Sequence, residues 1–194
     1  MSSSSSVETK KKQNKKMQTE AAAASATATT AENYINIFHK TILTQKVSLS
    51  IKQVGNNIKE NLETKIINEI EGLCIREGYI KPKSVMVLQY SSGTINCDNI
   101  EFTVMFECLV CHPVEGMKIL CNVKTITKAG IHAEVVLEDN IVPLIVFVAR
   151  DHHNLNKAFN DVKEDDEIVV KILGIRFELN DTNICAIGEL VEPK

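Results

Sequence analysis

The chain has 194 residues, of which 44% are hydrophobic and 24% are charged, and its formal net charge is −3. That length suits one large domain or two small ones, and the composition is ordinary for a soluble globular protein. No run of about 18 apolar residues occurs, and no apolar stretch follows the first charges, so we expect neither a membrane span nor a secretory signal. A net charge near zero disfavours a strongly cationic nucleic-acid binder.

Residues 1–32 differ in composition from the rest of the chain. A serine run, a basic cluster from Lys10 to Lys16 and an Ala/Thr/Ser tract offer almost nothing to bury, so we predict a disordered tail. The cluster suits a nuclear-import signal, a nucleic-acid tether or a solvating tail. The tail holds five lysines and three glutamates, which leaves 17 basic and 22 acidic residues and a net charge of −5 for the rest.

Residues 33–112 are predicted to form a small α+β tip domain. Apolar residues favour an opening strand over 34–43 and a second short strand over 47–51. A helix of about 14 residues should follow, because apolar residues recur every fourth position from Ile58 to Ile70. Asn57 and Glu60 resemble a capping box ahead of it, and Gly72 should end it. Further strands are predicted over 78–80, 84–90 and 99–110.

Residues 113–194 are predicted to form an all-β domain, with the boundary near Pro113. A short helix is expected over 151–161, with Leu155 and Phe159 buried. Five strands with a helical insert between the third and fourth have the order of an OB-type Greek-key barrel. The five strands are predicted over 118–127, 131–137, 141–149, 168–177 and 184–190.

The six cysteines are expected to be reduced in an intracellular compartment. The sharpest metal candidate is Cys108-x-x-Cys111 with His112 and Cys121 nearby, since zinc needs about four converging ligands. No second CxxC follows, and strand alternation puts Cys108 and Cys111 on opposite faces. We therefore interpret these cysteines as small apolar strand residues and expect no metal and no cofactor.

No set of residues with the pattern of an active site is recognised. Adjacent histidines point in different directions, so His152 and His153 are interpreted as surface residues or a helix cap, with RNA contact as the alternative. Three acids at 165–167 are interpreted as a solvated turn. The chain has no Ser/His/Asp set, no phosphate-binding GxxxxGK[ST] motif and no GxGxxG motif, so we do not expect an enzyme.

The predicted barrel carries a candidate RNA-binding surface. OB folds bind single strands with a basic groove and stacking rings. The rings available are Phe147 and Phe177, and Phe177 suits the core equally well. Few rings and a net acidic body predict modest, sequence-tolerant binding that weakens with salt. The predicted RNA-contacting residues are Lys124, Lys128, His132, Phe147, Arg150, Lys171 and Arg176.

Several short motifs, in their order and spacing, resemble the stalk subunit of multisubunit DNA-dependent RNA polymerases. This is the eukaryotic seventh-subunit family, which has an archaeal counterpart. The resemblance covers about residues 34–191. It is carried by Val54-Gly55-x-Asn57, Glu69-Ile70-Glu71-Gly72-x-Cys74, Gly78-Tyr79-Ile80, His112-Pro113-Val114-x-Gly116, Lys128-Ala129-Gly130-Ile131, Lys171-Ile172-x-Gly174-x-Arg176 and Ala186-Ile187-Gly188-x-Leu190.

The resemblance implies a non-catalytic subunit whose tip domain docks on the large polymerase core subunits near the clamp. It also implies a heterodimer with a helical stalk partner, and a barrel that meets nascent single-stranded RNA. The implied location is the nucleus, or the host cytoplasm or virion for a viral protein. By matching motif, the implied core-docking residues are Gly55, Asn57, Glu71, Gly72, Cys74, Gly78 and Tyr79.

An alternative from another class is a stand-alone OB-fold RNA-binding adaptor of the translation-factor or exosome type. Such proteins share the barrel but lack the tip domain with its Glu-x-Glu-Gly helix exit. The polymerase class, the RNA preference and the identity of the partner stay open. A composition with 22 Ile and 16 Asn suits an AT-rich genome, such as that of a large DNA virus or a protist.

Overall fold

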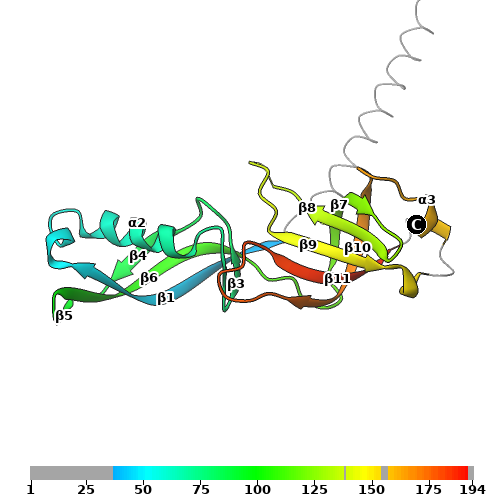
Figure 1. Ribbon diagram of the computed structural model, residues 1–194. Helices are drawn as coiled ribbons and strands as arrows, with labels where there is room; N and C mark the ends of the chain where they lie inside the picture. Colours follow the sequence, from blue (N-terminus) through cyan, green and yellow to red (C-terminus); the bar gives the residue numbers. More distant parts are fainter. Residues whose placement is uncertain (1–36, 138, 154–156, 192–194) are drawn as a thin grey trace, which may run out of the picture. The chain divides into compact units, whose positions relative to one another are not determined.

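The computed structural model describes residues 37–137, 139–153 and 157–191. The predicted tail, the start of the predicted opening strand and Leu155 lie outside these residues. The chain divides into Met1–Asn36 and a compact unit of Ile37–Lys194. In the described residues this second unit is mostly β, with a six-stranded sheet followed by a closed five-stranded barrel (Figure 1). None of the described helices is long and apolar enough to cross a membrane.

The sheet is built around two long antiparallel strands, β1 (Phe38–Ser50) and β6 (Asn99–Cys111). They pair along their whole length, from Phe38 opposite Cys111 to Ser50 opposite Asn99. The prediction of two short strands over 34–43 and 47–51 is therefore wrong. Polar residues at 44–46 interrupt the apolar pattern, but their backbone stays in the ladder. The other side of β6 pairs with β3 (Gly78–Ile80), β4 (Met86–Tyr90) and β5 (Thr94–Asn96), and β3 pairs with β2 (Cys74–Ile75).

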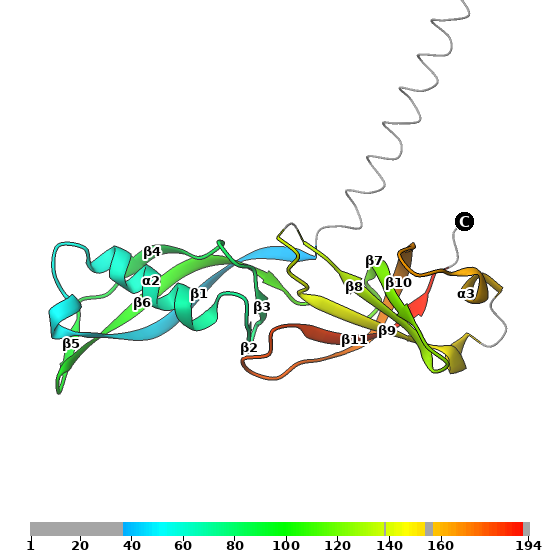
Figure 2. The same ribbon diagram turned by 45° about the horizontal axis from the view of Figure 1, so that its top comes forward.

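Helix α2 (Ile58–Ile70) lies against one face of this sheet, after a short 3₁₀ turn η1 (Ile51–Gln53) (Figure 2). Its buried stripe is Leu62, Ile66 and Ile70, and burying each such side chain is worth about 1.5–3 kcal/mol. Two polar contacts fix it: Lys65 Nζ donates to the Ser48 carbonyl at 2.6 Å, and the Val87 N–H donates to Glu63 at 3.2 Å. The predicted helix is thus confirmed.

The sequence predicts the C-terminal end of α2 correctly and its N-terminal cap incorrectly. Asn57 is the N-cap residue, but its side-chain amide donates to the Glu60 carboxylate at 3.1 Å and makes no cap hydrogen bond to the backbone. The capping-box prediction is therefore wrong, because the two side chains satisfy each other. At the other end Gly72 has φ +74°, as the predicted helix exit requires.

The barrel has the strand order β10-β11-β9-β8-β7. Its strands are β7 (Lys118–Ile126), β8 (Gly130–Val135), β9 (Leu144–Ala149), β10 (Glu167–Arg176) and β11 (Ile184–Leu190). The neighbours β9 and β11 are parallel, and the other pairs are antiparallel. The turn η2 (Arg150–His152) and helix α3 (Lys157–Asp161) lie between β9 and β10 in the chain. This order fits the predicted OB-type barrel.

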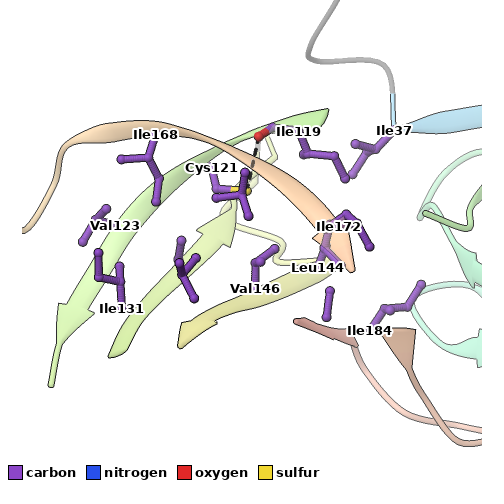
Figure 3. Packing of buried hydrophobic residues seen from close by; sticks show 14 of the residues in the cluster. Ile37, Ile119, Cys121, Val123, Ile131, Leu144, Val146, Ile168, Ile172 and Ile184 are labelled. Carbon is purple, nitrogen blue, oxygen red and sulfur yellow. Dashed lines mark hydrogen bonds between the residues drawn. The ribbon is translucent and has the colours of Figure 1, made fainter. Parts of the chain in front are cut away.

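Alternate residues of each barrel strand point inward and fill the core (Figure 3). Ile119, Val146 and Ile172 are 0% exposed, and the core continues into α3 through Phe159, which is 3% exposed. The burial predicted for Phe159 is thus confirmed. Strand β9 begins three residues later than predicted, because Pro143 has no N–H to donate to a ladder.

The sheet and the barrel share buried side chains. Cys74, Tyr79 and Cys111 belong to the same apolar cluster as the barrel interior. The Cys74 N–H donates to the Asp181 carbonyl at 2.7 Å, and the Asn180 N–H donates back to Cys74 at 2.8 Å. A cut at the predicted boundary near Pro113 would therefore expose apolar side chains on both sides.

Candidate nucleic-acid interface

A row of ring and aliphatic side chains crosses the outer surface of β8, β9 and β11. His132 lies opposite Phe147, and Phe147 lies opposite Ile187 in the strand register. The His132 and Phe147 ring centroids are 4.8 Å apart with the planes tilted by 50°, and Ile187 is 52% exposed. These three residues are called the ring row below. A surface row of ring and apolar side chains is suited to stacking an unpaired base.

Two lysines flank the ring row from the β7–β8 hairpin. Strand β7 has a register shift between Val123 and Thr125, so Lys124 is an extra residue on that strand. Such a bulge redirects a side chain, and the Lys124 side chain is 66% exposed, with its Nζ atom 4.0 Å from Glu134. Lys128 is exposed in the turn that joins β7 to β8. Ion pairs this exposed are worth about 0–1 kcal/mol, so Lys124 is available to a phosphate.

Gly130 brings the turn and the ring row together. A Cβ atom there would lie 2.2 Å from the Val148 carbonyl oxygen and 2.9 Å from the Phe147 ring. Only glycine leaves space for this approach, so the ring of Phe147 covers the end of the turn that carries Lys128. The structure thus places four predicted RNA-contacting residues, Lys124, Lys128, His132 and Phe147, on one side of the barrel.

Three other predicted RNA-contacting residues are placed differently. Lys171 and Arg176 lie on β10, which pairs with β7 and β11 on the far side of the closed barrel from the β8–β9 pair. Lys171 lies opposite Lys118 and Glu189, and Arg176 forms an exposed ion pair with Glu178 at 3.2 Å. The guanidinium of Arg150 is hydrogen-bonded within the chain, to the Lys128 carbonyl among others. An RNA role for these three residues stays a prediction.

The predicted core-docking residues fall into exposed and buried groups. Gly55 and Asn57 are exposed at the start of α2. Glu71 is half-buried, and its carboxylate accepts backbone N–H groups of Lys83, Ser84 and Val85 at 2.8, 3.1 and 3.0 Å. Glu71 therefore holds the loop that leads from β3 to β4, and this structural role does not depend on its predicted role in core docking.

The remaining docking residues are largely inside the molecule. Cys74 is 0% exposed and Tyr79 is 1% exposed. Gly78 has φ +133°, and a Cβ there would lie 2.4 Å from the Cys111 carbonyl oxygen. These residues shape the β2–β3 hairpin, and its exposed side chains are Arg76 and Glu77. Direct docking by the predicted set stays a prediction.

The cysteines of the metal candidate are buried strand residues. Cys108 and Cys111 belong to two different apolar clusters, as the alternation of strand faces predicts. Burial raises the pKa of the Cys108 thiol to about 11 and those of Cys111 and Cys121 to about 12, so all three are neutral thiols near pH 7. In the described ranges no group of three or more His, Cys, Asp or Glu side chains converges as a metal site would require.

Sequence reasoning misses two residues of this region. Ile187 completes the ring row, and the signal that could have found it is strand alternation. Its neighbours Ala186 and Gly188 face the core of β11, so Ile187 faces outward. The interpretation of His153 as a surface residue or cap is wrong: it is 4% exposed, and its Nε2 atom accepts the Leu190 N–H at 2.9 Å. Its long-range partner, 37 positions away, could not be found from local pattern.

The structure is a small OB-type barrel joined to a six-stranded sheet that carries one helix. No protein-family model matches the chain. It is 29% identical over 171 residues to a protein of Acanthamoeba polyphaga mimivirus that is provisionally named as a DNA-directed RNA polymerase subunit, with 81% of this chain and 83% of the relative covered. It is 26% identical over 165 residues to DNA-directed RNA polymerase II subunit RPB7 of Glycine max, with 79% and 92% covered. Subunit 7 of the Arabidopsis thaliana polymerase gives the same values.

These similarities extend over the sheet as well as the barrel, because the matched residues exceed the length of either part. They confirm the resemblance to the seventh-subunit family of DNA-dependent RNA polymerases. One of the relatives is from a large DNA virus.

Proposed function

We propose that this chain is a non-catalytic stalk subunit of a DNA-dependent RNA polymerase. It docks to the large core subunits through the sheet and α2, pairs with a helical stalk partner, and contacts nascent RNA with the barrel. The observation that carries the proposal is the similarity to polymerase II subunits over 92% of their length. A free-standing OB adaptor would be expected to match such subunits over the barrel alone.

The assembly is tested by affinity purification of the tagged full-length chain from actively transcribing cells, followed by mass spectrometry. The expected result is recovery of large polymerase subunits together with a smaller helical protein. Recovery of the chain only as a free monomer would contradict the proposal.

The docking surface is tested with charge reversals on the exposed β2–β3 hairpin, Arg76→Glu with Glu77→Arg. Deleting the sheet is unsuitable, since Cys74, Tyr79 and Cys111 complete the barrel core. Polymerase recovery should fall while RNA binding by the purified chain stays unchanged. Lys163→Glu, an exposed reversal before β10, is the matched control. Unchanged polymerase recovery by the hairpin variant would place docking elsewhere.

RNA contact is proposed for the ring row and its flanking lysines. Stacking of a base on an aromatic side chain is worth about 1–3 kcal/mol, so Phe147→Ala should weaken binding of a single-stranded oligouridylate by about tenfold. Leu179→Ala removes an aliphatic side chain that is 69% exposed on the β10–β11 loop, and it should leave affinity unchanged. Equal losses in the two variants would argue against a stacking site on β8 and β9.

A further inference from the structure

Arg150 holds three consecutive carbonyl groups of the β7–β8 turn. Its backbone N–H donates to Ala129 at 2.9 Å, its Nε to Lys128 at 3.0 Å, and its Nη2 to Thr127 at 3.4 Å. Its remaining nitrogen, Nη1, donates to the Asn160 side chain at 3.3 Å. The first two contacts have good geometry and the last two are long, but every nitrogen of the guanidinium has a partner within the chain.

Arg150 is itself backed by two stacked rings. Its guanidinium carbon lies 5.0 Å from the centroid of the Phe159 ring, and the His153 ring stacks on Phe159 at 5.1 Å with an interplanar angle of 18°. His153 is tied to β9 through the Ala149 carbonyl at 2.8 Å and to β11 through Leu190. The planar guanidinium is thus fixed against α3 and two barrel strands.

The turn held in this way is ordered by its own hydrogen bonds. The Thr127 hydroxyl donates to the Gly130 carbonyl at 2.9 Å, and the Gly130 N–H donates to that hydroxyl at 3.2 Å. Lys128 lies between them with an exposed side chain, and no acidic side chain in the described part of the chain forms a salt bridge with its ammonium group. A lysine on a fixed turn reaches a phosphate without the entropy loss of ordering the backbone first.

We propose that Arg150 acts on RNA through this turn, as a positioning residue for Lys128, and does not contact RNA itself. The inference rests on the RNA contact proposed above. It assigns Arg150 a different part in RNA binding from the direct contact predicted from sequence. Each of its three guanidinium nitrogens already donates a hydrogen bond to this chain, whereas the ammonium group of Lys128 forms no salt bridge among the described residues.

A double-mutant cycle on the full-length chain tests the proposal. Affinity for a fluorescent oligouridylate is measured for Lys128→Met, Arg150→Met and the double variant across a range of salt concentrations. Each single variant should lose up to about tenfold at about 0.1 M salt, with the salt slope reduced by about one. The double variant should match Lys128→Met alone, because a turn without Lys128 has nothing left to position. Multiplied losses in the double variant would overturn the proposal.

Arg150→Lys separates charge from geometry. It keeps the cation but loses the planar fork that reaches the carbonyl groups. Positioning predicts that Arg150→Lys binds RNA as weakly as Arg150→Met, whereas a direct ionic contact predicts near-normal affinity. Hydrogen exchange of the amides at 127–130 should rise in both variants and stay normal in Lys128→Met and in the control Lys163→Met.

The RNA contact and the positioning role of Arg150 are contradicted by different results. A wild-type chain that does not bind the oligonucleotide at low salt overturns the RNA contact, and with it the role of Arg150. Normal RNA binding with unchanged exchange in Arg150→Met overturns the positioning role alone. Circular dichroism of each variant shows whether the barrel is intact, and Arg150→Lys provides the comparison if Arg150→Met does not fold.

Discussion

The Oε1 atom of Glu71 accepts the backbone N–H of Ser84 at 3.1 Å, across 13 positions of the sequence. The same carboxylate accepts the N–H groups of Lys83 and Val85. A side chain at the end of α2 therefore organises the loop that enters β4. The Glu-x-Glu-Gly helix exit that suggested a docking motif is in this structure also a structural motif, with Glu71 holding the loop and Gly72 turning the chain.

Glu71→Ala should destabilise the chain substantially. Hydrogen bonds to a charged group contribute about 1.5–3 kcal/mol each. Three backbone amides would lose their acceptor, and the hydrogen bonds of Ser84 and Val85 are partly buried. We expect a loss of at least about 2 kcal/mol in the free energy of unfolding, measured by urea denaturation. Glu69→Ala is the matched control on the same helix, since among the described residues Glu69 forms one surface ion pair, with Lys65 at 4.0 Å. Similar effects of the two substitutions would show that the loop does not depend on Glu71.

His153→Phe should destabilise the barrel although it keeps a ring against Phe159. The Leu190 N–H can only donate, so Nε2 of His153 is an acceptor and Nδ1 carries the proton donated to Ala149. Phenylalanine leaves the buried Leu190 N–H and the part-buried Ala149 carbonyl without this partner, at about 1–3 kcal/mol for each group that stays unsatisfied. Thermal unfolding should show a clear drop in Tm. His152→Phe, at the exposed neighbouring position, should change Tm little, and equal drops would contradict the role of the two bonds.

The sequence predicts the helices and strands whose apolar residues repeat with a strong period. It does not predict elements that form only because they pair with residues far away in the chain. The stripe of α2 and the five barrel strands repeat at the period of their element, so the pattern predicts them with small errors at the ends. The two-residue strand β2 carries too few residues to show a period, and it forms because Cys74 pairs with Tyr79 on β3 and with the β10–β11 loop. Long-range pairing of this kind leaves no mark on the local pattern.

For the candidate RNA surface, too, the sequence predicts the suitable residue types but not their arrangement in space. Residue type alone predicts seven RNA contacts, because cations and rings are the groups that bind RNA. The structure groups Lys124, Lys128, His132 and Phe147, and separates Lys171 and Arg176 by the closure of the barrel. The side of the barrel on which a strand lies depends on strand order and register, which residue type does not reveal. A prediction from residue type therefore includes residues that do not share one surface.

Lys124 and Lys171 should therefore differ in their effects on RNA binding. Lys124→Met removes a cation beside the ring row, and it should lower affinity and reduce the salt slope by about one. Lys171→Met removes the same charge from β10 and should leave the slope unchanged. Fluorescence anisotropy with one oligonucleotide at several salt concentrations measures both. Equal slopes for the two variants would show that binding follows net charge rather than the surface on β8 and β9.

The buried thiols should make the chain sensitive to alkaline pH. Burial raises the pKa of Cys121 from its ordinary value of 9.0 to about 12 in the folded chain. Between these values the folded state holds a proton that the unfolded state has lost, so the free energy of unfolding falls as pH rises through this window. Below about pH 9 the contribution of the thiol to stability is fully present. Cys121→Ala removes this contribution at a cost in packing that does not depend on pH. Its destabilisation relative to wild type should therefore be largest near pH 7 and shrink at pH 10 to 11, measured by urea denaturation. The exposed Cys97→Ala is the control, and a difference for Cys121→Ala that stays constant with pH would contradict the prediction.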